Sequence, residues 1–304
     1  MTWSRQKDRL IPAVLMLVAA NLFWAGQGVA VKLLAGSVGP LATALLPLYS
    51  ITLLALGILC TRRDFGRKVR LAWRLRGEFF LAGICGQLMA QVGMTLGVHW
   101  STASNGAILS LLIPIFGAII AVWLLRERLS TLRVSTLLLG LSGVILLMPL
   151  HRGSGSHQFA GDLLIVTGCL GSAFYNVYSK RLLSDFSGLE TLLFSYLSTT
   201  AFSLPLLFWC EPHCLSNLAH LTGLQWASFA YLAILLYGLS MYLFLEALGT
   251  VDAVVASASL YLMPLFGVTL AFSILGERLA PRALTGSAIV LLATLLLFRF
   301  DYTA

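Results

Sequence analysis

The chain consists largely of long apolar segments joined by short polar ones, and this feature constrains its fold more than any other. Hydrophobic residues make up 59% of the chain and charged residues only 11%. A soluble domain carries about 25% charged residues. A chain this apolar cannot cover its surface in water, so the solvent around most of it must be lipid.

Ten segments are long and apolar enough to cross a bilayer, for which a helix needs about 20 mostly apolar residues. They lie at residues 10–34, 40–61, 77–98, 103–125, 131–150, 160–182, 188–210, 224–248, 253–275 and 281–300. The strands of a membrane β-barrel would be about 10 residues long and would alternate in polarity, which these segments do not. We therefore predict an all-α integral membrane protein with ten transmembrane helices.

The distribution of Lys and Arg predicts the orientation. With the N-terminus inside, sixteen of the 20 Lys and Arg residues fall on the cytoplasmic side, and the remaining four, Lys32, Arg152, Arg278 and Arg282, fall outside. Cytoplasmic loops of membrane proteins carry such an excess of positive residues. Both termini are thus expected in the cytoplasm, and the net charge of +8 requires no nucleic-acid partner.

One motif occurs twice. Residues 111–129 read LLIPIFGAIIAVWLLRERL and residues 261–279 read YLMPLFGVTLAFSILGERL, identical at nine of nineteen positions. Ten spans give five to each half, and an odd number means that the second half enters the membrane inverted. We predict two inverted five-helix repeats, at 1–150 and 151–304. Inverted repeats are typical of secondary transporters, whose substrate site lies near the midplane between the halves.

The repeated motif, together with WAGQGVAVK at 24–32, resembles the drug/metabolite transporter superfamily and, within it, the ten-span EamA-type members. The resemblance implies a small-molecule carrier, usually an exporter, in the bacterial inner membrane. Among these members the pattern is most similar to amino-acid exporters, including those for aromatic amino acids. A multidrug or nucleotide-sugar-type carrier of the same superfamily is an alternative, and a channel or a membrane scaffold is a further one.

Polar and aromatic residues concentrate in spans 1, 3 and 4 and in their inverted counterparts 6, 8 and 9. A polar group inside a span costs free energy unless it faces a cavity or a partner. The alternative for each residue is an interhelical hydrogen bond, which contributes about 0.6 kcal/mol on average. The residues expected to line a central substrate cavity are Asn21, Trp24, Gln27, Gln87, Gln91, Asn105, Tyr175, Asn176, Tyr237, Ser240, Ser257 and Tyr261.

No Asp, Glu, Lys or Arg lies near the middle of any predicted span. An exporter of cationic drugs often uses a carboxylate within the membrane as counter-ion, and a proton relay also depends on such groups. Their absence favours a neutral or zwitterionic amphipathic substrate. It also favours facilitated diffusion or exchange over proton coupling.

The repeated motif also supplies candidates for conformational roles. A proline within a helix removes a hydrogen bond and can kink it, so each proline with the glycine that follows it forms a candidate hinge; a purely structural kink is the alternative. The glutamate that closes each motif lies at a span end and is a gate or a structural clamp. The hinge residues are Pro114, Gly117, Pro264 and Gly267, and the gate or clamp residues are Glu127 and Glu277.

Other chemistry finds little support in the sequence. Cys210, His213 and Cys214 lie close together, but two thiols and one imidazole do not make a four-ligand zinc site; a disulfide between Cys210 and Cys214 or two free thiols both remain open. Residues 153–157 lack the Gly-Lys-Ser/Thr of a phosphate-binding loop. We expect no cofactor, no metal and no enzymatic activity, and the sequence leaves monomer and homodimer open.

Overall fold

The computed structural model describes residues 2–126, 130–147 and 156–263 and, beyond these, isolated positions between 266 and 296. The regular elements of the described part are all helical, apart from one isolated bridge between Ala35 and Val38. In chain order the elements are α1 (Thr2–Ala25), α2 (Gln27–Leu34), α3 (Pro40–Cys60), α4 (Phe65–Arg74), α5 (Arg76–Leu81), η1 (Ala82–Leu88), α6 (Met89–Trp100), α7 (Ala103–Leu109), α8 (Leu112–Leu125), α9 (Thr131–Leu147), α10 (Ser156–Leu182), α11 (Gly188–Cys210), α12 (Cys214–Leu218), α13 (Gly223–Ala230), η2 (Tyr231–Ser240), α14 (Met241–Leu248), α15 (Ala253–Ala258) and η3 (Ser259–Tyr261).

Six helical segments of the described part are long and apolar enough to cross a membrane. They are Ile11–Leu34, Pro40–Cys60, Arg76–Trp100, His157–Leu182, Gly188–Cys210 and Gly223–Leu248. Each matches a span predicted from the sequence to within a few residues. The all-helical class is therefore confirmed, together with these six apolar spans.

The predicted span at 103–125 is divided in the structure. α7 ends at Leu109 and α8 begins at Leu112. Pro114 explains the break, because it has no N–H to donate to the carbonyl of Ser110 four residues earlier. Instead, that carbonyl accepts from the Ile113 N–H at 3.0 Å, which tightens the turn. Pro114 therefore lies in the first turn of α8 rather than in the middle of one continuous helix.

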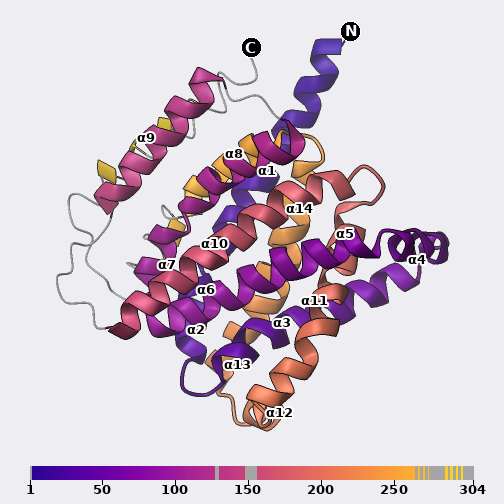
Figure 1. Cartoon of the computed structure of the whole chain (residues 1–304), viewed down its shortest axis with the longest axis vertical. Helices are drawn as coiled ribbons and strands as arrows, with labels where there is room; N and C mark the ends of the chain where they lie inside the picture. The colour runs from indigo at the N-terminus through magenta and orange to yellow at the C-terminus, as the bar shows by residue number, and fades with distance from the viewer. Residues whose placement is uncertain are drawn as a thin grey trace.

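The bundle is held together along the crossing of α10 with α6 and α8, and α10 lies between these two helices in Figure 1. Small residues allow the backbones of α6 and α10 to approach closely, as is common between membrane helices. A Cβ atom on Gly93 would lie 2.8 Å from the Cα of Gly168, and one on Gly97 would lie 2.8 Å from the carbonyl oxygen of Gly161. The glycines are therefore required by this contact.

Large apolar side chains also cover the outside of the bundle. Leu53, Trp123, Phe159 and Trp209 are 70%, 82%, 70% and 86% exposed. Extended apolar patches are rare on soluble monomers and mark surfaces that contact another apolar phase. The exposed side chains are consistent with helices whose outer faces contact lipid.

Two stretches of the chain adopt π-helical geometry. η1 covers Ala82–Leu88 in the third predicted span, and η2 covers Tyr231–Ser240 in the eighth. π-Helical turns are rare and occur frequently at functional sites. Both stretches contribute to the central cavity described next.

Candidate functional site

A cavity lies inside the bundle, between the α1–α2 junction, η1–α6 and α10 on one side and residues of η2, α14, α8 and η3 on the other. Its lining residues are Trp24, Gln27, Gln87, Ala90, Gln91, Met94, Ile113, Ser172, Tyr175, Asn176, Leu236, Met241, Leu260 and Met263. Its volume is about 50 Å³, which leaves room for a few water molecules. None of these lining residues is charged.

A break in the first span brings Trp24 and Gln27 to the cavity. α1 ends at Ala25, and α2 begins at Gln27 after a single turn residue, Gly26. The hydroxyl of Tyr231 donates to the carbonyl of Phe23 at 2.5 Å. A Cβ atom on Gly26 would lie only 2.2 Å from the Tyr231 hydroxyl oxygen, so glycine is needed where this tyrosine enters the break.

The third span contributes two amides on one helical face. The side-chain N–H of Gln91 donates to the Oε1 of Gln87 at 3.0 Å, and the Nε2 of Gln87 lies 3.9 Å from the sulfur of Met241. Gln87 is 1% exposed and Gln91 8%. An amide can both donate and accept hydrogen bonds, so the pair offers polar contacts inside an otherwise apolar wall.

Aromatic rings and thioethers form the rest of the wall. The Trp24 ring packs on Phe244, with ring centres 5.2 Å apart and an interplanar angle of 55°. Met94, Met241 and Met263 also line the cavity. Methionine is flexible and polarizable, and it adapts to apolar groups of different shapes. The lining therefore suits an uncharged or zwitterionic molecule with an apolar part.

Six of the twelve residues expected in the cavity lie in its lining, and six do not. The six that line it are Trp24, Gln27, Gln87, Gln91, Tyr175 and Asn176. Asn21, Asn105, Tyr237, Ser240, Ser257 and Tyr261 lie elsewhere and make other contacts. The sequence pattern missed Ser172 and the three methionines, because an isolated serine and apolar side chains give no polar signal.

The residues outside the lining mostly contact other helices. The amide N–H of Asn21 donates to the Ser259 hydroxyl at 3.0 Å, which links α1 to η3. The hydroxyl of Tyr261 donates to the Leu137 carbonyl at 3.2 Å in α9.

Three more of the non-lining residues, Tyr237, Ser240 and Ser257, also make contacts outside the cavity. The backbone carbonyl of Tyr237 accepts from the Tyr196 hydroxyl at 3.0 Å. The hydroxyl of Ser240 donates within its own helix to Leu236. Ser257 packs against Gly117, where a Cβ atom would lie 2.7 Å from the serine hydroxyl oxygen. Gly117 thus permits close packing of α8 on α15.

A polar cluster closes one end of α10. The Lys32 ammonium donates to the backbone carbonyl of Ser101 at 3.0 Å. The Ser101 hydroxyl donates to the Asp162 carboxylate at 2.5 Å, and the Asn105 amide donates to the same carboxylate at 3.0 and 3.2 Å. These contacts join α2, α6, α7 and α10. We call these four residues the Lys32 cluster.

A second cluster closes the other end of α10. The Lys180 ammonium donates to the backbone carbonyl of Val251 at 3.0 Å and lies 3.5 Å from the Asp252 carboxylate. The Arg133 guanidinium donates to the same carboxylate at 2.6 Å. These contacts join α9 and α10 to the turn between α14 and α15. We call these four residues the Lys180 cluster.

The two clusters correspond by position in the chain. Ser101 and Val251 are 150 residues apart, the offset of the repeated motif, and each accepts a hydrogen bond from a lysine at 3.0 Å. Asp162 and Lys180 lie eighteen residues apart on α10, which is about 27 Å along a helix. Ser172, Tyr175 and Asn176 lie between them and line the cavity. The cavity therefore lies between two similar contacts.

The pKa of Asp252 is set by the two basic side chains of the Lys180 cluster. Partial burial by itself raises the pKa of a carboxyl group, but the hydrogen bond from Arg133 and the charges of Lys180 and Arg133 outweigh it. The pKa of Asp252 consequently lies below its ordinary value. The carboxylate is therefore ionised, and its ion pairs are formed, throughout the physiological pH range.

The remaining candidates fall partly outside the described residues. Pro264, Glu127 and Glu277 lie outside them, and Gly267 is described only as part of a helix. Cys210 and Cys214 are both free thiols; Cys210 is exposed and Cys214 buried. In the part of the chain that the structure describes, no group of three His, Cys, Asp or Glu side chains is placed to hold a metal ion.

Comparison with known proteins identifies the class. The pattern of the EamA-like transporter family matches residues 11–148 and again residues 159–299. These matches cover most of the chain, which therefore belongs to the EamA-like transporter family. It is a membrane-embedded, multi-pass transporter.

Two relatives agree with this class, and a solved structure shares the fold. A probable terminal-alkyne amino-acid exporter of Streptantibioticus cattleyicolor is 26% identical over 96% of this chain and 95% of the relative. An S-adenosylmethionine uptake transporter of Rickettsia prowazekii is 23% identical over 66% of this chain and 65% of its own. One crystal structure of a protein has a TM-score of 0.74 at 17% identity, covering 96% of this chain and 99% of that one. The last likeness concerns the fold alone.

Proposed function

We propose that the protein exports a small neutral or zwitterionic metabolite by alternating access through the central cavity. The proposed substrates are amino acids, including aromatic ones. The observation that carries this proposal is the composition of the cavity. Its lining combines side-chain amides with Trp24, Tyr175 and three methionines and contains no ionised group. Amides can orient the polar end of an amino acid, and rings and thioethers can pack against its apolar side chain.

The likeness to an exporter of amino acids that carry a terminal alkyne supports the substrate class. The side chain of such an amino acid is uncharged and apolar, as the lining requires. A carrier of organic cations would place an acidic group against its substrate, and the lining has none. The S-adenosylmethionine uptake transporter among the relatives is also a transporter of a small metabolite, but it takes its substrate up rather than exporting it.

Alternating access is supported by the two lysine clusters. The Lys32 cluster joins one end of α10 to Ser101 and Asn105, and the Lys180 cluster joins the other end to Val251 and Asp252. Both clusters are formed in this structure. The cavity volume of about 50 Å³ is smaller than typical ligand pockets of about 300 Å³ or more. In the proposed cycle, one cluster opens for substrate entry and the other opens for release.

The proposed architecture is ten spans, with repeats at 1–150 and 151–304 inverted relative to one another and both termini in the cytoplasm. The equivalent positions of η1 and η2 and the matching lysine contacts support an inverted repeat. Reporter fusions after residues 70 and 304 are expected to give cytoplasmic signals. A periplasmic signal at either point contradicts the proposed orientation.

Counterflow in proteoliposomes tests the proposal directly. Vesicles loaded with unlabelled phenylalanine and diluted into labelled phenylalanine are expected to accumulate label transiently without ATP. A panel of unlabelled amino acids, a quaternary-ammonium drug and a nucleotide sugar then reports the substrate class by competition. Conductance without counterflow indicates a channel, and neither signal indicates a scaffold; either outcome contradicts the proposal.

A further inference from the structure

A second and larger hollow lies on the outer surface of the bundle, between α3, α11 and the segment formed by η2 and α14. Its volume is about 570 Å³. We call this hollow the outer groove. Its apolar lining consists of Ile51, Leu54, Ala55, Ile58, Leu189, Leu192, Ile234, Gly238, Leu239 and Tyr242. None of these residues belongs to the central cavity, so the groove is a separate site.

The length of the outer groove fits one leaflet of a bilayer. Its lining runs along α3 from Ile51 to Ile58, which is about 10 Å along a helix, and continues to Arg62 just beyond the end of α3. The hydrocarbon core of a bilayer is about 30 Å thick, so one leaflet is about 15 Å. A partner helix would contact the bundle across both leaflets, whereas one acyl chain of a lipid spans only one.

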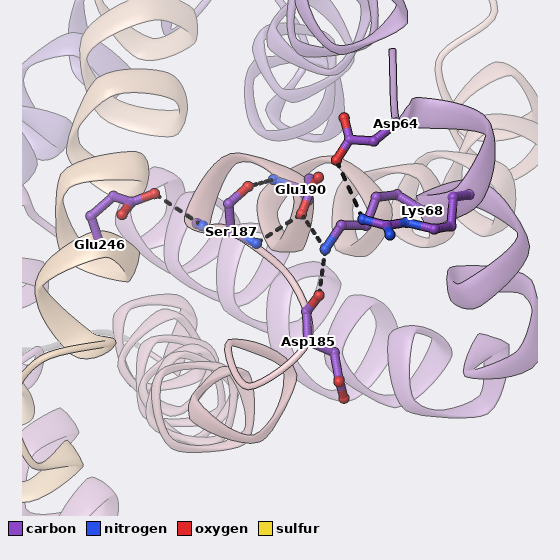
Figure 2. Close-up of polar contacts among 8 residues, drawn as sticks. Asp64, Lys68, Asp185, Ser187, Glu190 and Glu246 are labelled. Atoms are coloured by element: carbon purple, nitrogen blue, oxygen red, sulfur yellow. Dashed lines mark hydrogen bonds and ion pairs between the residues drawn. The ribbon is translucent and has the colours of Figure 1, made fainter. Parts of the chain in front are cut away.

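The polar end of the outer groove carries an arginine. Arg62, Ser187 and Glu246 lie there. The Glu246 carboxylate accepts from the backbone N–H of Gly188 at 3.1 Å, so it is already engaged at the N-terminus of α11 (Figure 2). Arg62 is exposed and forms no ion pair with any described residue. Its charge is therefore available to an anion at the mouth of the groove.

The helix that follows Arg62 has three distinct faces. Phe65, Lys68 and Ala72 face the protein, while Val69 and Trp73 are 40% and 71% exposed. The third face carries the exposed side chains of Arg67, Arg70 and Arg74, around a surface hollow of about 440 Å³. A helix with separate basic and aromatic faces is typical of segments that lie in the headgroup layer of a membrane.

The position of α4 is fixed by Lys68. Its ammonium lies 3.4 Å from the Glu190 carboxylate and donates to the Asp185 carbonyl at 2.6 Å, as Figure 2 shows. The same ammonium lies 5.2 Å from the centre of the Phe186 ring. Lys68 thus attaches α4 to the turn between α10 and α11. The arginines of the third face remain exposed on a helix that begins three residues after Arg62.

We propose that the outer groove binds one anionic phospholipid. One acyl chain occupies the apolar lining, and the phosphate pairs with Arg62. The arginines of α4 attract the negative headgroup and raise its local concentration. The site depends on the chain being membrane-embedded, and it does not depend on which metabolite the central cavity carries.

Lipid retention measured by native mass spectrometry tests this proposal. The purified full chain is loaded with phosphatidylglycerol or with phosphatidylcholine of the same acyl chains, and the bound lipid is counted during stepwise detergent washing. The unmodified protein is expected to retain one phosphatidylglycerol at least fivefold more persistently than phosphatidylcholine. Equal retention of the two lipids overturns the proposal.

Matched variants separate the outer groove from general lipid contact. Arg62→Ala removes the phosphate partner and Leu54→Trp fills the apolar lining, and each is expected to reduce phosphatidylglycerol retention to the level of phosphatidylcholine. The controls Arg63→Ala and Leu53→Trp change adjacent exposed residues outside the groove and are expected to retain the lipid. Equal losses in variants and controls overturn the proposal.

Two further arms identify the occupant. Soluble glycerol 3-phosphate at millimolar concentration is expected not to displace the lipid, because it lacks the acyl chain; displacement would make the site one for free phosphate esters. A mass corresponding to two protein chains that is lost in Leu54→Trp but not in Leu53→Trp would assign the outer groove to a second copy of the chain, and that result also overturns the proposal.

Discussion

At the residue scale, Trp24 contacts both the central cavity and the Phe244 ring, so it can contribute to substrate binding and to helix packing. One side of the indole ring lines the central cavity, and another packs on Phe244, which is completely buried. Substitution therefore affects both substrate contact and helix packing. A useful test has to separate the two effects.

Trp24→Ala is expected to raise the half-saturating substrate concentration about three- to tenfold in counterflow. Aromatic contacts contribute about 0.5–1.5 kcal/mol beyond burial, and 1.4 kcal/mol corresponds to a factor of ten. Trp24→Phe keeps a ring and should recover most of the affinity. Trp123→Ala is the control, since Trp123 is 82% exposed on the outer surface. Unchanged affinity in Trp24→Ala places the substrate elsewhere.

At the element scale, the proposed transport cycle depends on the contacts that hold the two ends and the middle of α10 in place. Its ends carry Asp162 and Lys180, each in a polar cluster, and its middle packs on α6 through glycine. The ends are tied by polar contacts that can break and reform. At Gly168 and Gly171 the backbone of α10 lies close against α6, so this crossing is expected to stay fixed while the polar contacts break.

Lys32→Met and Lys180→Met are expected to open opposite ends of the protein. Each removes one donor to a backbone carbonyl and leaves the other cluster intact. The measurement is labelling of Ser172→Cys, in a chain lacking the five native cysteines, by an impermeant thiol reagent added from one side at a time. Lys32→Met should speed labelling from the Lys32 side severalfold, and Lys180→Met from the other side. Faster labelling from the same side in both variants contradicts alternating access.

Gly93→Ala is expected to destabilise the bundle. The added methyl group would lie 2.8 Å from the backbone of Gly168, and overpacking of this kind typically costs about 1–3 kcal/mol. Thermal unfolding in detergent should show a lower midpoint. Gly57→Ala is the matched control, because a Cβ atom there meets nothing within 4 Å and alanine favours the helix. A midpoint that falls no further in Gly93→Ala than in Gly57→Ala refutes the steric explanation.

At the scale of the whole molecule, the Lys32 cluster and the Lys180 cluster lie at opposite ends of α10 and share no residue, so each end can be altered by mutation without changing the other. The Lys32 cluster depends mainly on hydrogen bonds to one carboxylate and one carbonyl, whereas the Lys180 cluster adds ion pairs to Asp252.

Closure at the Lys180 end is expected to be constant from pH 8 to pH 5. Since the pKa of Asp252 is lowered in the folded protein, its stabilising contribution is fully present above the unfolded value of about 3.9 and is lost as the pH falls through the folded value. The thiolate is the reactive species, so labelling of Ser172→Cys from the Lys180 side is compared at each pH with labelling of the same cysteine in the Asp252→Asn variant. The ratio of the two rates should change only below about pH 4. Asp252→Asn should label faster at every pH. A midpoint above pH 5 contradicts this assignment.

The apolar segments determined the class of the protein and the positions of six spans, because a helix in lipid must be long and apolar whatever it packs against. The duplicated motif determined the family in the same way, since a sequence pattern is a local property. Pro114 predicted a kink within one continuous span, whereas the structure divides that span at Ser110 and Leu111.

Which polar residues face the cavity was decided only by the tertiary structure. Helical spacing groups Asn21 with Trp24, yet Asn21 bonds to Ser259 while Trp24 lines the cavity, although both residues lie on α1. The lysine clusters also depend on the fold, because Lys32 and Ser101 are 69 residues apart in the chain and meet only when α2 packs beside α6. Periodicity gives the face on which a side chain lies, and packing alone decides what that face meets.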